Sequence, residues 1–365
     1  MKVSDGMNYA PKGKAQPVVK PGEFIFSAAH LDHGHIYGMT NGLLEAGGTL
    51  KYVYDPDPKK VEAFVKAYPQ VKVARSEEEL LNDKETNMVC GAAITNERCA
   101  LGLRAMQAGK DYFTDKAPFT TLEQLDSAKK MVAQTGKKYM VYYGERLHVE
   151  GAVLAGNLIE QGAIGKVIEI KTRMGHTGPL GPGAKHKIAE TSEPMTEAEK
   201  CSTWWHQHDC GGGAMADYCC YGSVVSYWMA GKPAVAAMGM RVNSIHALAD
   251  AEDNAAMIER NPDCYAVLEG TWTTYNHTFK SPIVYGTKGA LVGDYKTGKV
   301  QFYHTDGTVE DIENDPLPEE LKDVACAYVH HMDTDEPIHY TVQPEFNLDA
   351  MAILDAGIRS SASGK

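Results

Sequence analysis

Short strands and helices alternate along the first 143 residues, and this order constrains the fold more than any other feature of the chain. Apolar runs suited to buried strands stand at 24–29, 50–54, 71–74, 88–94, 110–114 and 139–143. Helical patterns separate them at 36–46, 59–68, 77–81, 96–108 and 121–135. Strands that alternate with helices of this length predict a parallel sheet covered on both faces. We therefore expect a doubly wound domain over residues 21–145, preceded by an extended, proline-containing arm over residues 1–20.

The pattern changes after Glu150. A helix at 152–161 and a strand at 166–174 precede a passage at 175–208 that is rich in Gly, Pro and His, and a further helix follows at 214–229. Beyond it the chain shows successive strand patterns at 235–246, 265–275, 283–284, 290–295 and 300–304. Strands that follow one another without helices between them predict a largely antiparallel sheet.

The expected fold class is therefore α/β, with two domains of different texture. The N-terminal doubly wound domain has the Rossmann-type pattern, and a C-terminal α/β domain over residues 146–343 carries a large, mostly antiparallel open sheet. We expect this second domain to bind substrate and to form the oligomer. A C-terminal helix within residues 344–365 could pack back on the Rossmann domain.

Composition excludes several classes of partner. With 36 Lys and Arg against 48 Asp and Glu, the 365-residue chain has a formal net charge of −12, so it lacks the basic stripe that nucleic acid or an anionic membrane would need. No stretch approaches the roughly 20 apolar residues that cross a bilayer, and residues 1–20 lack the apolar core of a secretory signal. The eight cysteines show no Cys-x-x-Cys pair, so we expect reduced thiols and a cytoplasmic protein.

The first strand-to-helix turn is the expected place for a dinucleotide, because ligands of doubly wound sheets bind at the carboxyl ends of the strands. This turn reads His30-Leu31-Asp32-His33-Gly34-His35. A glycine fingerprint would have glycine where His30, Asp32 and His35 stand, so the usual phosphate-cradling loop is absent. The following helix N-terminus still offers N–H groups to a pyrophosphate, although Asp32 would bring a negative charge close to it.

Asp55 ends the second strand about twenty residues after the first. A carboxylate at this place can hydrogen-bond the ribose hydroxyls and repel a 2′-phosphate, which favours NAD over NADP. The alternative is that Asp55-Pro56-Asp57-Pro58 turns the chain and caps the next helix. In this strand–helix–strand context we favour the ribose.

Lys116 follows the strand at 110–114 within Asp115-Lys116-Ala117-Pro118, so it is expected near the nicotinamide. It could hydrogen-bond a substrate hydroxyl and help to remove its proton. The alternative is a solvated surface lysine, as most lysines are. The side chains expected to hold the cofactor are His30, Leu31, Asp32, His35, Asp55, Thr95, Asn96, Asp115, Lys116 and Pro118.

Several ordered motifs resemble those of a known family. They are the run 109–118 with its Asp-Lys-Ala-Pro, Gln161-Gly162-Ala163-Ile164-Gly165-Lys166, Gly211-Gly212-Gly213-Ala214-Met215-Ala216-Asp217, Tyr285-Gly286-Thr287-Lys288-Gly289-Ala290 and the closing helix that ends at 361–365. Together they are similar to the Gfo/Idh/MocA oxidoreductases, over nearly the whole chain beyond Lys20. The resemblance implies a Rossmann domain, an open α/β sheet domain, and NAD(P)-dependent oxidation or reduction of sugars or polyols.

The resemblance also implies roles for three residues. Lys116 takes the place of the family's signature lysine, and Asp217 that of its active-site aspartate after the triple glycine. Many members carry a histidine four residues later, where this chain has Tyr221, as in members similar to glucose–fructose oxidoreductase. Asp217 and Tyr221 share a helix face at this spacing. A catalytic tyrosine would need a nearby positive charge, because its ordinary pKa is about 10; the alternative is a core aromatic.

Two departures from the family pattern stand out. Asp115 replaces the signature glutamate, and the first turn lacks all three glycines. Candidates for sugar contact are aromatic, imidazole and guanidinium groups, which suit sugar faces and hydroxyls, although some could be packing anchors or solvated loop residues. They are Arg146, His148, His176, Trp204, Trp205, His206 and His208.

Clustered histidines raise the question of a metal. Groups occur at 30–35, at 206–209 and at 330–331, but none has a recognised zinc spacing, so no metal is expected.

Three functions follow from this sequence. The leading one is an NAD(P)-dependent oxidoreductase that transfers hydride between nicotinamide and a hydroxyl or keto carbon of a sugar or sugar-like polyol. One alternative is a glycoside hydrolase that retains NAD and acts by transient oxidation, elimination, hydration and re-reduction. The other is a non-catalytic sugar-binding family member. A homodimer or homotetramer is expected, because an open sheet leaves one face that needs a partner.

Overall fold

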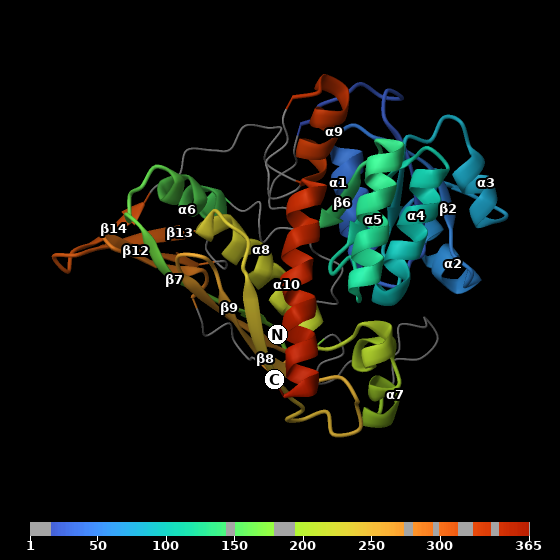
Figure 1. Cartoon of the computed structure of the whole chain (residues 1–365). Coiled ribbons are helices and arrows are strands. Elements are labelled where there is room, and N and C mark those ends of the chain that lie inside the picture. The colour runs from blue at the N-terminus through green and yellow to red at the C-terminus, as the bar shows by residue number, and fades with distance from the viewer. Residues whose placement is uncertain are drawn as a thin grey trace. The chain divides into compact units, whose positions relative to one another are not determined.

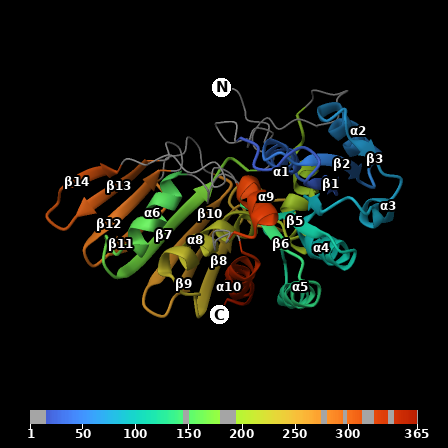
Figure 2. The same cartoon turned by 90° about the horizontal axis from the view of Figure 1, so that it is seen from above.

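The computed structural model describes residues 16–143, 150–178, 194–273, 280–294, 299–312, 324–336 and 343–364. The chain divides into two compact units, Met1–His148 with Pro316–Leu348, and Val149–Asp315 with Asp349–Lys365. Each unit has its own sheet (Figures 1 and 2). Within the described part of the chain, no helix is long and apolar enough to span a membrane.

The first unit contains a six-stranded parallel sheet in the order β3-β2-β1-β4-β5-β6. The strands are β1 (Ile25–Ala29), β2 (Thr49–Tyr54), β3 (Lys72–Val73), β4 (Met88–Gly91), β5 (Asp111–Asp115) and β6 (Tyr139–Tyr142). This order reverses its direction of growth between β1 and β4, which is the crevice where doubly wound sheets bind ligands. The predicted Rossmann-type topology is confirmed.

Helices cover both faces of this sheet. The apolar sides of α1 (His35–Glu45), α2 (Pro58–Ala67) and α9 (Val324–Thr334) belong to one buried cluster with β1, β2 and β4. On the other face, Gly102 of α4 (Arg98–Gln107) lets that helix approach closely, since a Cβ there would touch Tyr112 and Tyr139. The first unit also contains the short helix α3 (Glu77–Asn82) and the helix α5 (Leu122–Thr135), which packs against α4.

The second unit contains an eight-stranded sheet in the order β14-β13-β12-β11-β7-β10-β9-β8. Its strands are β7 (Val167–Gly175), β8 (Ala236–Val242), β9 (Asn254–Arg260), β10 (Tyr265–Thr271), β11 (Ile283–Gly286), β12 (Gly289–Asp294), β13 (Lys299–His304) and β14 (Val309–Ile312). All neighbours are antiparallel except β7 and β10, which run parallel. The predicted large, mostly antiparallel sheet is confirmed.

Helices of the second unit pack on one face of that sheet. They are α6 (Glu150–Glu160), α8 (Cys220–Ala230) and most of α10 (Pro344–Ser363). The short helix α7 (Glu197–Cys201) lies instead against the 3-10 turn Trp204–His206. From Asp349 onward α10 belongs to this unit, where Gly357 lies against Met257 of β9 and against Gly239 of β8. Immediately before α8, Met215–Cys219 form a π-helical turn.

Among the described residues, the strands β9 and β14 and the α-helices α7 and α9 do not correspond to any predicted element. Strand β9 reads Asn-Ala-Ala-Met-Ile-Glu-Arg, in which Ala, Met and Glu are helix formers. Its place between β8 and β10 supplies backbone partners on both sides, and these tertiary hydrogen bonds outweigh the local preference.

Candidate functional site

The β1–α1 turn of the first unit holds its shape without the glycines of a phosphate loop. His30 adopts a left-handed backbone with φ 56°, a conformation that usually favours glycine. Its Nε2 lies 2.6 Å from Glu77 Oε2, which fixes the ring. At the start of α1, the His35 N–H donates to His33 Nδ1 at 2.9 Å, so a side chain already satisfies this helix-terminal donor.

Carboxylates beside this turn are paired with a lysine. Lys60 Nζ lies 2.5 Å from Asp32 Oδ1 and 3.8 Å from Asp55 Oδ1. Partial burial works against the charge of Lys60, but the carboxylates of Asp32 and Asp55 raise its pKa above the ordinary value. The negative charge of Asp32, which the sequence placed near a pyrophosphate, is therefore neutralised locally.

Asp55 organises the turn at the end of β2. Its Oδ2 accepts from the Leu31 N–H at 2.6 Å and its Oδ1 from the Asp57 N–H at 2.8 Å, while Asp57 caps α2. These contacts are those expected if Asp55 and Asp57 turn the chain and cap the next helix. Each carboxylate oxygen can accept a second hydrogen bond, so contact with a ribose stays a prediction.

Asp115 is fully buried at the C-terminal end of β5, where its side chain contacts several charged or polar groups. Its carboxylate lies 2.8 Å from His35 Nδ1, 3.4 Å from His33 Nδ1 and 3.0 Å from an Arg98 guanidinium nitrogen. Burial opposes ionisation, but these neighbouring charges, led by His35 and Arg98, hold the pKa of Asp115 below its usual range. Burial lowers the pKa of His33, which favours its neutral form.

Lys116 is held at the end of β5 by Arg98. The Arg98 guanidinium donates to the main-chain oxygens of Lys116 and Ala117, and its Nε donates to the Ala93 carbonyl at 2.8 Å. Lys116 is 6% exposed, so it is not a solvated surface lysine. The Lys116–Ala117 peptide bond is cis.

The remaining predicted cofactor residues also lie at this edge of the first unit. Thr95 is buried at the start of a 3-10 turn (Thr95–Glu97) after β4, and the Asn96 carbonyl accepts from Gln124 Nε2 at 2.9 Å. Pro118 is buried next to the Lys116 segment.

Asp217 and Tyr221 lie on one continuous helical segment of the second unit. Asp217 is in the π-helical turn and Tyr221 in the first turn of α8. Asp217 Oδ2 accepts from the indole nitrogen of Trp272 at 2.8 Å, and Trp272 itself is 1% exposed. π-Helical turns inside helices recur at functional sites, which supports a role for this segment.

A buried glutamate supports the triple-glycine segment before that turn. Glu252 accepts from the Met215 N–H at 2.8 Å through its side chain and from the Ala214 N–H at 2.9 Å through its carbonyl. At Gly213, with φ 107°, a Cβ would lie 2.5 Å from Glu252 Oε1, so this glycine permits the contact. Burial raises the pKa of Glu252 to about 7.

Predicted sugar contacts of the second unit have local partners. The Trp204 and Trp205 rings stack with centroids 3.7 Å apart, and His176 Nδ1 accepts from the Gly178 N–H at 2.8 Å. His206 is buried beside Trp272, with ring centroids 5.3 Å apart, and burial lowers its pKa to about 4. His208 Nε2 lies 3.6 Å from Glu252 Oε2. Arg146 and His148 lie outside the described residues.

Each unit therefore gathers part of the predicted site. The first unit brings His30, Leu31, Asp32, His35, Asp55, Asp115 and Lys116 to one sheet edge. Asp217 and Tyr221 belong to the second unit, so their common action with Lys116 stays a prediction. Sequence reasoning missed Lys60, Arg98, Glu252 and Trp272, which act through contacts between distant segments and leave no local pattern.

The residues of the first unit fit a nicotinamide dinucleotide. Lys60 and Arg98 pair the carboxylates of Asp32 and Asp115, so phosphates would meet no uncompensated negative charge from either. The half-buried His33 and the partly exposed His30 offer imidazole groups where glycine backbone usually approaches the phosphates.

Family models match both units. One, described as the oxidoreductase family, NAD-binding Rossmann fold, covers residues 29–143. The other, the GFO/IDH/MocA C-terminal domain, covers residues 153–292. The two matches follow one another along the chain in the order of the two sheets.

Known proteins resemble the chain in sequence or fold. D-Xylose dehydrogenase of Paenarthrobacter nicotinovorans is 26% identical over 153 residues, which is 42% of this chain and 36% of that protein. Levoglucosan dehydrogenase in complex with NADH and levoglucosan superposes with a TM-score of 0.77 at 15% identity, covering 94% of this chain and 98% of that one. Aldose–aldose oxidoreductase of Caulobacter crescentus gives 0.75 at 16% identity, covering 94% and 98%.

At these identities the solved structures establish the fold alone, whereas the family models establish descent. With both domain models matched in order, and with the Rossmann-type and open sheets in place, this chain belongs to the Gfo/Idh/MocA family of oxidoreductases.

Proposed function

We propose that the chain is an NAD(P)-dependent oxidoreductase that interconverts a hydroxyl and a keto carbon of a sugar or sugar-like polyol. The observation that carries this proposal is the fixation of Lys116, the residue that matches the family's signature lysine. Arg98 holds the carbonyls on both sides of the Lys116–Ala117 bond, and the lysine is withdrawn from bulk water. A fixed, buried ammonium group is suited to hydrogen-bond a reacting hydroxyl.

The protein's own groups would handle the proton of that hydroxyl. Lys116 would donate a hydrogen bond to the substrate oxygen, and Tyr221 would exchange the proton with it. Asp217, oriented by Trp272, would accept a hydrogen bond from a neighbouring sugar hydroxyl. The nicotinamide, when bound, supplies or accepts the hydride.

NAD is the preferred cofactor in this proposal. The Asp55 carboxylate lies beside the β1–α1 turn and would repel a 2′-phosphate, although Lys60 lies 3.8 Å from it and partly offsets this repulsion. His30, His35, Asp32, Thr95, Asn96 and Pro118 would line the same edge of the sheet. The eight free thiols, six of them buried, suit a reducing cytoplasm.

A carbohydrate is the proposed substrate class. The proteins similar to this chain include D-xylose dehydrogenase and levoglucosan dehydrogenase. In the second unit, the stacked Trp204 and Trp205, with His176, His206 and His208, would supply apolar faces and hydroxyl partners for a sugar. Arg146 and His148 remain predicted contacts.

A direct assay tests this function. The purified protein is incubated with NAD⁺ or NADP⁺ and a panel of aldoses, anhydrosugars and polyols, and formation of reduced nicotinamide is followed by absorbance. We expect turnover with NAD⁺ and at least one sugar. Release of aglycone from glycosides without net reduction would instead support the redox-type hydrolase. Failure to bind either nucleotide would leave a sugar-binding protein and overturn the proposal.

A substitution at residue 116 tests the assigned role. In Lys116→Met the apolar side chain has similar length but cannot donate a hydrogen bond, so we expect kcat to fall about 100-fold or more. Cofactor affinity, measured by fluorescence titration, should change little. Lys110→Met is the control, because Lys110 also lies by β5 but donates to the Asp83 carbonyl. Unchanged kcat in Lys116→Met would refute the role.

A further inference from the structure

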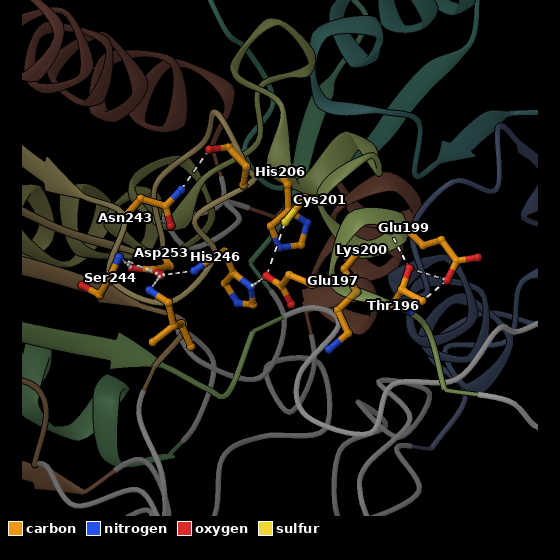
Figure 3. A network of polar contacts seen from close by, with 12 residues as sticks. Thr196, Glu197, Glu199, Lys200, Cys201, His206, Asn243, Ser244, His246 and Asp253 are labelled. Carbon is orange, nitrogen blue, oxygen red and sulfur yellow. Dashed lines mark hydrogen bonds and ion pairs between the residues drawn. The ribbon is translucent and has the colours of Figure 1, made fainter.

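Three potential metal ligands meet in the second unit, apart from the residues proposed to act on sugar. Glu197 and Cys201 lie four residues apart on α7, and His246 comes from the segment after β8 (Figure 3). Their ligand atoms all lie within 4.8 Å of one another. Glu197 Oε1 is 2.8 Å from His246 Nδ1 and 3.4 Å from Cys201 Sγ. Ligand atoms on a tetrahedral zinc ion lie about 3.5 Å apart, close to the separation of Glu197 and Cys201. The shorter His246–Glu197 distance is that of a hydrogen bond, which an ion would lengthen.

The backbone on both sides of the cluster is fixed. A capping box between Thr196 and Glu199 begins α7, which sets the direction of Glu197 and Cys201. On the other side the buried Asp253 carboxylate accepts from the N–H groups of Ser244, Ile245 and His246. Figure 3 shows these hydrogen bonds on both sides of the cluster, which fix the backbone that carries the three side chains.

Two imidazole nitrogens at the cluster are buried and lack a hydrogen-bond partner among the described residues. They are Nε2 of His206 and Nε2 of His246, from rings that are 1% and 5% exposed. The ring centroids lie 5.1 Å apart, and in Figure 3 the His206 ring extends toward the other three side chains. A buried polar atom without a partner is costly, so each ring has one nitrogen that would gain from a ligand. In His246 this nitrogen is Nε2, whereas Nδ1 faces Glu197.

We propose that Cys201, His246 and Glu197 bind a zinc-like transition-metal ion. Thiolate and imidazole select zinc, and cobalt in its place, over magnesium or calcium, which prefer oxygen ligands. On binding, the Cys201 S–H bond breaks, its proton passes to solvent, and a metal–sulfur bond forms without any redox change. The neutral His246 ring coordinates through its unprotonated nitrogen, and the Glu197 carboxylate exchanges its hydrogen bond from Cys201 for a bond to the metal.

Such an ion would be structural. Hydrogen bonds connect His246 to Trp272 through Asp253. The Asp253 carboxylate accepts from the His246 main-chain N–H, and the Asp253 carbonyl accepts from the Trp272 main-chain N–H at 2.7 Å. Trp272 in turn donates to Asp217. The metal would thus restrict the motion of the His246 and Trp272 segments that orient Asp217. This consequence rests on the proposed function, whereas binding of the metal does not.

Metal binding is tested on the full-length protein without sugar or nucleotide. Protein stripped with a chelator is titrated with Zn²⁺ and with Co²⁺, and bound metal is measured by elemental analysis after desalting. We expect one ion per chain and, with Co²⁺, a thiolate-to-cobalt charge-transfer band. Absence of stoichiometric binding by folded protein, checked by circular dichroism, would overturn the proposal.

Substitutions locate the site. Cys201→Ser should abolish the charge-transfer band, and His246→Gln should weaken Zn²⁺ binding about 100-fold or more. Cys210→Ser is the matched control, since Cys210 lies on the same segment but outside the cluster, and it should bind as the wild type does. If Cys201→Ser fails to fold, Glu197→Gln and chelator treatment replace it: chelator should lower the Tm of the wild type by several degrees and that of Glu197→Gln by less. Equal binding by wild type and His246→Gln would refute the assignment.

Discussion

At the scale of single residues, the Trp272–Asp217 hydrogen bond orients the aspartate that is proposed to bind substrate. Trp272→Phe removes the indole donor and keeps most of the ring. Because a hydrogen bond to a charged group contributes about 1.5–3 kcal/mol, we expect kcat/KM for sugar to fall about tenfold or more. The dissociation constant for nucleotide, measured by fluorescence, should stay the same.

Trp228→Phe is the control for that substitution. Trp228 is another buried indole of the second unit, where its ring fills the space beside Gly156. It should lower stability without a selective loss of sugar turnover. If both variants lose sugar turnover equally, Trp272 acts through packing and has no special role toward Asp217.

Glu252 gives the molecule a stability that depends on pH. Burial raises the pKa of Glu252 to about 7 from its ordinary value of 4.5, so the folded protein keeps this proton at pH values where the unfolded chain has lost it. The folded state is therefore favoured at low pH, and this contribution is lost as pH rises from 4.5 toward about 7. The Glu252→Gln side chain cannot ionise, so the stability of this variant should not fall over this pH range for that reason.

Thermal unfolding between pH 5 and 8 measures the effect. We expect the Tm of Glu252→Gln, relative to wild type, to rise by about 5 °C across this range. Glu62→Gln, at an exposed position on α2, should keep a constant offset from wild type. Parallel Tm profiles for wild type and Glu252→Gln would contradict a raised pKa.

Individual site residues could be predicted where their position in the chain carries the information. Lys116 follows a strand that ends at the ligand edge, and the resemblance of the triple-glycine motif to the family's pattern singles out Asp217, so both could be proposed from the sequence. Arg98 and Glu252 could not, because each acts on a segment 18 to 37 residues away through main-chain contacts. Whether a charged side chain is buried can be predicted only when the groups that it contacts are known.

At the scale of elements, close backbone contact explains why α10 lies on the second sheet. A Cβ at Gly239 of β8 would overlap the Gly357 carbonyl, whereas a Cβ at Gly357 would overlap the flexible end of Met257. Main chain cannot move aside as a side chain can. We therefore expect Gly239→Ala to destabilise by about 1–3 kcal/mol and Gly357→Ala by less, measured by denaturant unfolding.

A second substitution distinguishes the two cases. Met257→Ala should rescue Gly357→Ala in part, because it removes the atoms that the new methyl group would meet. It should not rescue Gly239→Ala. Equal rescue of both variants would show that α10 can shift along β8, contrary to the close contact.

Elements with strong periodicity were predictable and those shaped by tertiary partners were not. The alternation over residues 24–143 follows from local pattern, and β1 to β6 lie within a few residues of the predicted strands. Helix α9 was not predicted; its residues Ala325, Cys326, Tyr328 and Val329 join the core cluster of the first unit. Such an element is defined by what it packs on, and a local pattern does not report that.

At the scale of the whole molecule, one face of the second sheet is apolar and exposed. Met238 and Met240 of β8 are 64% and 75% exposed, and Met238 pairs with Ile258 of β9, which is 50% exposed. Further along the same face, Tyr265 and Tyr285 flank Glu169. A large exposed apolar patch marks an interaction surface, and a self-complementary sheet face suits a second copy of the chain.

We therefore expect a homodimer or homotetramer formed through this face. The double variant Met240→Asp, Ile258→Asp would bury two unpaired carboxylates in the interface, which is costly. Light scattering at micromolar concentration should therefore show a shift toward monomer. Val73→Asp, at a 55% exposed apolar position on β3 of the first unit, should leave the assembly intact. A wild-type chain that is already monomeric would refute the dimer, and a double variant that stays assembled would place the interface elsewhere. Because these side chains point away from the helices that pack on the other face of the sheet, loss of assembly should leave the fold of the second unit intact, and circular dichroism would confirm this.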